Sequence, residues 1–206
     1  NPHPPIPERL NAVGVELRKD VIPAMPERTS GLHEVALSLG GNLGNSVQFF
    51  RQAIQAFSAS PNVSILRTSS VWRTSPWGKT DQPDFLNMAL VLQTDLQPLQ
   101  LLTLCQAIEN AAGRTRAERW GPRSLDIDVI SFSDVECTSA EITLPHPRAH
   151  ERAFVLAPLA EIASGLVIQG RTIHQWLAHV RGQQSADKTE GTCLPDNAAT
   201  ARLLTG

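Results

Sequence analysis

The sequence GRTRAERWGPRSLDID, residues 113–128, leads from an arginine-rich loop directly into an expected strand that carries two carboxylates. Alternate residues of a strand point to the same face, so Asp126 and Asp128 should project side by side while the apolar residues around them face the core. Two adjacent carboxylates repel each other unless a cation lies between them, and Mg²⁺ prefers one or two carboxylates together with water and phosphate oxygens. The stretch therefore predicts a metal-assisted phosphate-transfer site.

Four arginines come just before the two carboxylates: Arg114, Arg116, Arg119 and Arg123. Their planar guanidinium groups are suited to phosphate oxygens. For an isolated D-x-D pattern, a pair of solvated strand residues is the more common explanation. Ion pairing alone explains this cluster poorly, because an exposed ion pair contributes only about 0 to 1 kcal/mol. A bound phosphate and a metal ion together account for both signs of charge.

The segments on either side of this stretch predict the fold. From apolar spacing and turn residues we expect a strand at 35–39, a turn at 40–45, a helix at 46–58, β-rich runs at 62–74 and 85–94, a helix at 99–112 and a strand at 125–132. Further helices are expected near 150–163 and 172–180. The order β-α-β-β-α-β is typical of an α+β fold, a ferredoxin-like α/β sandwich with helices on one face of a mainly antiparallel sheet.

The composition predicts one domain between two less structured ends. The chain has 206 residues, of which 41% are hydrophobic, enough for a single core. We expect residues 1–32 to form a proline-rich flank that is not an independent domain, residues 33–181 to form the folded domain, and residues 182–206 to form a flexible C-terminal tail.

Charge, cysteine content and hydropathy restrict the class of protein. The formal net charge of -2 argues against a chain that coats nucleic acid. The three cysteines, Cys105, Cys137 and Cys193, lie far apart and are odd in number, which favours a reducing cytoplasm over a disulfide framework. No apolar run approaches the roughly 20 residues that a membrane helix needs. We therefore expect a soluble, cytoplasmic protein with no nucleic-acid or membrane partner.

Several residues are open to two interpretations on sequence grounds. His146 lies between Pro145 and Pro147, and a positioned polar contact and a structural role are equally compatible with that rigid segment. Phe85 and Phe154 would by default belong to the core. Cys105 is most simply a small apolar residue that faces the core.

Three separated blocks of the chain resemble the 6-hydroxymethyl-7,8-dihydropterin pyrophosphokinase family. They are RTSPWG at 73–78 with DQPDFLN at 81–87, the stretch 109–130, and PHPR at 145–148 followed by RAF at 152–154. The resemblance covers about residues 34–180. It implies an ATP-dependent diphosphotransferase of folate biosynthesis, which moves the terminal pyrophosphoryl group of ATP onto the pterin alcohol and leaves AMP. ATP is then the co-substrate, and two Mg²⁺ ions are the cofactors.

The resemblance also implies roles for single residues. Asp126 and Asp128 would hold the two Mg²⁺ ions, with Arg114 and Arg123 as catalytic, phosphate-facing arginines. The residues implied on the nucleotide side are Gln106, Glu109, Arg116, Arg119, Trp120, Thr143, His146 and Arg152. Those implied on the pterin side are Thr74, Trp77, Phe85, Asn87 and Phe154. Phe85 and Phe154 would stack on the two faces of the pterin ring, and Thr74 and Asn87 would hydrogen-bond to its polar edge.

Two rival interpretations remain open. The first is a two-metal nucleotidyl- or phosphotransferase that acts on a different alcohol. The second is a non-catalytic ferredoxin-like RNA-binding module, which the missing aromatic signature and the net charge disfavour. Because enzymes of this family occur fused to other folate enzymes, we also expect fusion to, or proximity to, another folate-pathway enzyme. The sequence singles out no general base.

Overall fold

The computed structural model describes residues 31–75, 83–113, 124–181 and 186–189. Their elements, in chain order, are β1 (His33–Gly41), α1 (Ser46–Ala59), β2 (Val63–Thr68), β3 (Trp72–Thr74), β4 (Phe85–Thr94), α2 (Pro98–Ala111), β5 (Asp126–Phe132), β6 (Cys137–Thr138), β7 (Thr143–Leu144), the 3-10 helix η2 (Ala149–Glu151), α3 (Ala153–Ala163), β8 (Val167–Ile168), β9 (Arg171–Thr172), α4 (Ile173–Val180) and β10 (Asp187–Lys188). Within these ranges, no helix is long and apolar enough to cross a membrane.

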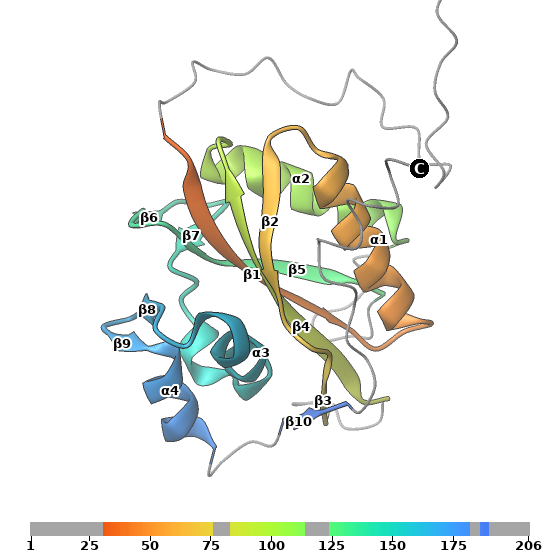
Figure 1. The fold of residues 1–206 in the computed structure, drawn as a ribbon, viewed down its shortest axis with the longest axis vertical. Coiled ribbons are helices and arrows are strands. Elements are labelled where there is room, and N and C mark those ends of the chain that lie inside the picture. Colours follow the sequence, from red (N-terminus) through yellow and green to blue (C-terminus); the bar gives the residue numbers. More distant parts are fainter. Residues whose placement is uncertain (1–30, 76–82, 114–123, 182–185, 190–206) are drawn as a thin grey trace, which may run out of the picture.

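The main sheet has six strands in the order β10-β3-β4-β1-β5, with β2 paired to β4 beside β3 (Figure 1). All pairings between its strands are antiparallel. Strand β4 pairs with β1 on one side and with β2 and then β3 on the other. The expected ferredoxin-like α+β arrangement is therefore confirmed.

Helices cover both faces of this sheet. Helices α1 and α2 pack on one face over Leu37, Met88 and Leu90, which is the expected arrangement. Helix α3 covers the opposite face, where Ala89 and Ile130 contribute to a second apolar cluster, and α4 packs against α3. The expectation that helices lie on one face alone was therefore wrong. Figure 1 shows the two helix pairs on different sides of the strands. The physical reason is that β1 and β4 are nearly continuously apolar, as is typical of strands buried on both faces.

The two helices that flank the sheet centre begin and end as their sequences predict. The side chain of Asn45 accepts a hydrogen bond from the Gln48 amide and caps α1. Phe50 and Phe57 of that helix are fully buried. At the end of α2, Gly113 has a φ of 74°, the left-handed conformation that a helix stop requires.

Three segments differ from the expectations. Strand β1 runs through Gly41, so the expected turn begins later than residue 40. The run 62–74 is interrupted at 69–71, which separates β2 from β3. Within the expected C-terminal tail, Asp187 and Lys188 form β10 against β3, and the Thr189 amide donates to the Val71 carbonyl oxygen at 3.0 Å. A free edge on β3 explains this last difference, because unpaired strand groups accept an added strand.

Candidate active site

Polar residues from three strands meet in adjacent rows on the face of the sheet that α3 covers. In β1, Gly40 pairs with Asn87 of β4 and with Asp126 of β5. Two residues earlier, Ser38 pairs with Asp128. Paired residues of an antiparallel sheet point to the same side, so the two aspartates and Asn87 share one face. Both aspartates are half-buried.

Two glycines allow these groups to come together. A Cβ added at Gly40 would lie 3.1 Å from Asn87 Oδ1, so the missing side chain leaves room for that amide. A Cβ added at Gly41 would overlap the Ser124 carbonyl oxygen, which lies directly against β1. Both glycines were expected in a turn, and Ser38, which is buried, was not among the predicted site residues. Paired glycines at the end of an apolar strand were the available signal, since glycine within a strand often marks a close approach of other groups.

A hydrogen-bonded pair forms the other end of this surface. The Asn87 side chain donates from Nδ2 to Thr74 Oγ1 at 2.8 Å, and both residues are buried. Phe85 pairs with Thr74 across the strands and is half-buried. The Asn42 side chain donates to the Pro83 carbonyl oxygen at 3.2 Å and links the end of β1 to the start of β4. Three residues predicted on the pterin side therefore lie together on β3 and β4.

Arg152, the residue before α3, connects the aspartates to a fourth residue predicted on the pterin side. Its Nη1 lies 3.6 Å from Asp128 Oδ2, and its Cζ lies 5.6 Å from the centre of the Phe154 ring. Its Nε is buried and has no hydrogen-bond partner. Burial lowers the pKa of the guanidinium, and the neighbouring Asp128 opposes that shift. A buried donor of this kind is suited to an incoming anionic group.

His146 is held beside the same carboxylates by backbone contacts. Its amide donates to the Ile130 carbonyl oxygen at 2.8 Å, and its Nδ1 accepts a hydrogen bond from the Arg148 amide at 3.1 Å. Burial, followed by the positive charge of Arg152, lowers the pKa of His146 to about 4. The imidazole is therefore neutral at pH 7, and the hydrogen bond to Nδ1 assigns the proton to Nε2.

Helix α2 runs beside β5 and contributes a buried carboxylate. Glu109 is 3% exposed, and its Oε1 accepts a hydrogen bond from the Ile127 amide at 2.7 Å. Gln106 is half-buried one turn earlier on the same helix. Cys105 is fully buried, as expected, and burial together with the charges of Glu109 and Asp128 raises the pKa of its thiol. In this structure Glu109 supports the strand that carries the aspartates.

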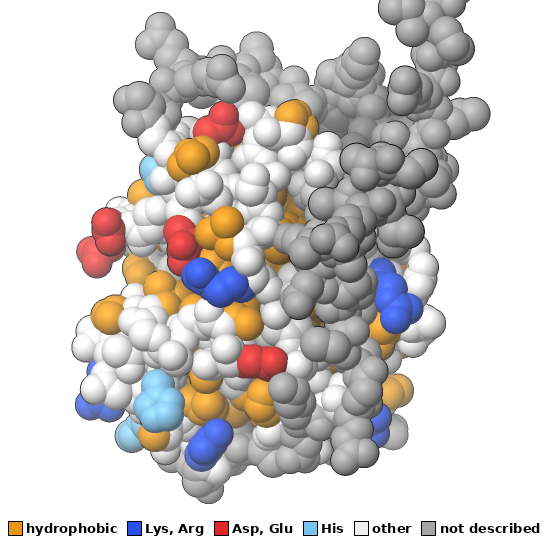
Figure 2. All heavy atoms as spheres, viewed as in Figure 1, with side chains coloured by type: hydrophobic (Ala, Val, Ile, Leu, Met, Phe, Trp, Pro, Cys, Tyr) orange, Lys and Arg blue, Asp and Glu red, His pale blue; other side chains and the backbone are white. Residues whose placement is uncertain are grey.

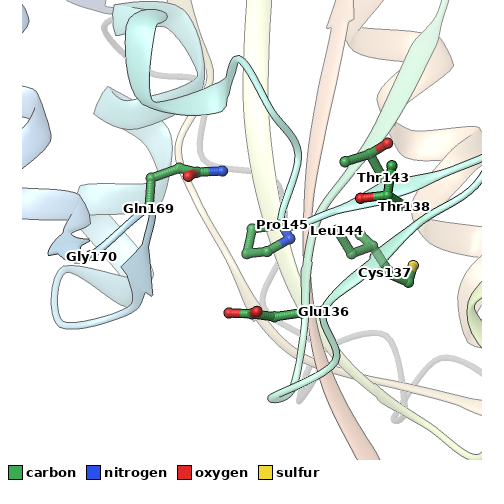
Figure 3. A pocket seen from close by; sticks show the side chains of 8 residues that line it. All are labelled: Glu136, Cys137, Thr138, Thr143, Leu144, Pro145, Gln169 and Gly170. Atoms are coloured by element: carbon green, nitrogen blue, oxygen red, sulfur yellow. The ribbon is translucent and has the colours of Figure 1, made fainter.

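Thr143, predicted on the nucleotide side, lies on β7, which contacts β5. It lines a hollow of about 520 Å³ between the β6–β7 and β8–β9 hairpins, together with Glu136, Pro145, Gln169 and other residues (Figure 3). Neither aspartate lines this hollow. The role of Thr143 on the nucleotide side therefore stays a prediction.

Six predicted site residues lie outside the described residues: Trp77, Arg114, Arg116, Arg119, Trp120 and Arg123. Within the described part of the chain, no group of three or more histidine, cysteine, aspartate or glutamate side chains could hold a metal ion. The two aspartates on β5 form a pair of carboxylates and not a closed cage, which is the donor set that Mg²⁺ prefers when substrate oxygens complete its shell.

Comparisons with known proteins agree with this arrangement. The sequence profile of the family described as 7,8-dihydro-6-hydroxymethylpterin-pyrophosphokinase (HPPK) matches residues 36–164. A 2-amino-4-hydroxy-6-hydroxymethyldihydropteridine pyrophosphokinase of Methylorubrum extorquens is 45% identical over 142 residues, which cover 69% of this chain and 90% of that protein. A mitochondrial folate synthesis bifunctional protein of Arabidopsis thaliana is 38% identical over 144 residues, 70% of this chain and 26% of that protein.

A solved structure shows the same fold. The crystal structure of wild-type HPPK-DHPS from Plasmodium falciparum superposes with a TM-score of 0.58 at 12% identity. The match covers 81% of this chain and 48% of that one, so this chain spans less than half of the longer protein.

Proposed function

The chain belongs to the 7,8-dihydro-6-hydroxymethylpterin-pyrophosphokinase family of ATP-dependent diphosphotransferases in folate biosynthesis, and on that premise we propose its reaction in detail. It transfers the pyrophosphoryl group of ATP to 6-hydroxymethyl-7,8-dihydropterin in a Mg²⁺-dependent reaction that yields the pterin diphosphate and AMP. The observation that carries the proposal is the shared sheet face of Asp126, Asp128 and Asn87, which puts phosphate-side and pterin-side groups next to each other.

Asp126 and Asp128 are the proposed ligands of two Mg²⁺ ions. Their spacing on one face of β5 and their partial exposure fit a cation that also takes water and phosphate oxygens. When bound, the ions would neutralise the triphosphate and polarise its phosphorus atoms. Arg152, whose guanidinium lies 3.6 Å from Asp128, would bind a phosphate oxygen through its buried Nε. Neutral His146 would donate a hydrogen bond from Nε2 without adding charge.

The pterin is proposed to bind over β3 and β4. Because Asn87 Nδ2 donates to Thr74, the Asn87 Oδ1 is directed toward Gly40 and can accept from a ring N–H group. The Thr74 hydroxyl accepts from Asn87 and keeps its own proton to donate. Phe85 and Phe154 are the proposed stacking partners of the ring, and each such contact contributes about 0.5 to 1.5 kcal/mol beyond the burial of area.

The proposed chemical step is an in-line displacement at the β-phosphorus of ATP. The pterin hydroxyl oxygen forms the new bond, the bond from the β-phosphorus to the α-side bridging oxygen breaks, and AMP leaves. No residue is assigned as the base that takes the hydroxyl proton. The chain's contribution is to orient the two substrates and to stabilise charge, which dominate phosphoryl-type transfers.

The rival interpretations make different predictions. If the acceptor is the pterin, Asn87→Ala and Phe154→Ala should abolish pterin binding and leave nucleotide binding largely intact. If the acceptor were another alcohol, the pterin would not stimulate AMP release by the wild type. An RNA-binding module would need a basic face, whereas the lysine and arginine side chains coloured in Figure 2 are dispersed among acidic and apolar ones. The Arabidopsis relative is a bifunctional protein, and we propose that this chain likewise works with another folate-pathway enzyme.

The test is an assay of AMP release from ATP and Mg²⁺, with and without 6-hydroxymethyl-7,8-dihydropterin. AMP that forms only with the pterin, and that is lost in a folded Asp126→Ala/Asp128→Ala variant, supports the proposal. Absence of AMP from a folded protein that binds ATP would direct attention to a different acceptor.

A further inference from the structure

The carboxylate of Glu161, on the last part of α3, accepts three hydrogen bonds from residues at the start of β3 and just before it. Its Oε1 accepts from the Ser70 hydroxyl at 2.8 Å. Its Oε2 accepts from the Ser70 amide at 3.2 Å and from Trp72 Nε1 at 3.1 Å. Three donors from one short segment therefore converge on a single carboxylate. Hydrogen bonds to an ionised acceptor are stronger than those between neutral groups.

The segment that Glu161 holds is the interruption between β2 and β3. There the Ser69 hydroxyl accepts from the Ala89 amide at 2.8 Å, and the Ser69 amide donates to the Ala89 carbonyl oxygen at 3.0 Å. Ser69 is thus bonded to β4 and its neighbour Ser70 to α3. The next strand therefore starts from a point fixed to two other elements, although it is only three residues long.

Glu161 also connects the two walls of the proposed pterin site. On α3 it follows Phe154 by seven residues, which is close to two full turns, so both side chains lie on one side of the helix. On β3, Thr74 follows Trp72 by two residues and points to the same face. The distance between the stacking residue on α3 and the polar residue on β3 therefore depends on this connection.

We propose that Glu161 is a positioning residue of the pterin site, which acts through Ser70 and Trp72 to hold Thr74 at the correct distance from Phe154. The inference rests on the proposed function and deepens it, because it names a residue outside the substrate contacts that determines the affinity for pterin. Loss of this connection should displace β3 and not the start of α3, which carries both Phe154 and Arg152. The aspartates lie on β5, which does not pair with β3, so the ATP side should respond little.

The decisive variant is Glu161→Gln, which keeps the shape but replaces one accepting oxygen with a donating amide. Trp72→Phe keeps a six-membered aromatic ring and removes the Nε1 donor together with the five-membered ring of the indole. The matched control is Glu34→Gln. Glu34 is an exposed acid at the start of β1, at the end of that strand away from Gly40, and it pairs with Arg67 at 2.7 Å. For each variant, KM for pterin, KM for ATP, kcat and the denaturant midpoint would be measured.

Glu161→Gln should raise KM for pterin on the order of tenfold, since misplacement of a binding wall by a fraction of an ångström has effects of this size. KM for ATP should change less than about twofold. Trp72→Phe should show a smaller effect in the same direction. The double variant should be less impaired than the product of the two single effects, because both changes break the same connection. Glu34→Gln should leave both KM values unchanged.

Equal increases in both KM values, or a loss of stability with KM for pterin unchanged, would overturn the proposal and leave Glu161 with a purely structural role. If Glu161→Gln does not fold, Trp72→Phe and Ser70→Ala carry the same comparison. If the wild-type protein releases no AMP with pterin, the proposed function fails, independently of Glu161.

Discussion

His146 offers a quantitative test of the electrostatics of the site, through the pH dependence of stability. Its pKa is about 4 in the folded protein and about 6.5 when exposed, because burial and Arg152 disfavour the charged ring. Below pH 6.5 the unfolded chain binds a proton that the folded chain does not, so His146 lowers stability progressively as the pH falls from 6.5 to about 4. Above pH 6.5 both states are neutral and the effect vanishes.

The expected magnitude follows from the same values. Each tenfold change in proton affinity corresponds to about 1.4 kcal/mol, so the full shift amounts to roughly 3 kcal/mol. The ring is only half-buried, and solvent screening should reduce this to about 1 to 2 kcal/mol. His146→Asn keeps an oxygen close to the position of Nδ1, where the Arg148 amide donates, and removes the titration.

The measurement is urea unfolding of the wild type and of His146→Asn at pH 7, 6 and 5. The variant should gain stability relative to the wild type as the pH falls, by about 1 kcal/mol at pH 5. His174→Asn, at an exposed position on α4, is the matched control for the exchange of a histidine for an asparagine. Parallel curves for the wild type and His146→Asn between pH 7 and 5 would refute the account of His146 as a half-buried, neutral ring.

Three further predictions concern the surroundings of the site. Gly41→Ala should lower the free energy of unfolding by about 1 to 3 kcal/mol in urea unfolding, because the added methyl group overlaps the Ser124 carbonyl oxygen; an unchanged midpoint would contradict that close approach. Glu109→Leu should lower the free energy of unfolding by about 1 to 3 kcal/mol, because the Ile127 amide loses its acceptor, and Glu109→Gln should lower it less. Equal losses of stability in the two variants would show that packing and not the hydrogen bond matters. Arg152→Lys keeps the charge but loses the planar fork, so AMP release should fall about tenfold or more with the fold intact, and full activity would exclude a specific role for the guanidinium.

The sequence predicts the structure well where the spacing of apolar residues or a helix cap determines it. The alternation along β5 correctly placed Asp126 and Asp128 on one face, and the expected helices at 46–58 and 99–112 agree with α1 and α2 to within one residue at each end. These features depend on residues within one or two turns of each other. Local physical chemistry is sufficient to predict them.

Features that depend on long-range pairing could not be read from the sequence. The alignment of Asn87 with Gly40, and the contact of Glu161 with Ser70, join residues dozens of positions apart. Strand register and helix placement determine both, and neither leaves a local signal. The second helical layer was missed for the same reason, since an apolar run does not reveal which helix will cover it.

The orientation of the two aspartates illustrates how much depends on register. Strand β1 pairs with β5 out of step by one residue, because Ala36 pairs with Ser131 but Leu37 pairs with Val129. Ile130 is therefore the extra residue of a β-bulge. Beyond the bulge Phe132 lies in the core under α1 and α2, on the same side as Val129.

Without the extra residue, strict alternation would place Phe132 on the same face as Asp126 and Asp128. Burial of Phe132 under α1 and α2 would then turn both carboxylates into that apolar core, where two unpaired charges would be strongly destabilising. The bulge resolves the conflict: the strand buries Phe132 on one face and directs the aspartates to the other, where Arg152 precedes α3. Ile130 also presents its carbonyl oxygen to the His146 amide, so one irregular residue orients the carboxylates and fixes the histidine beside them.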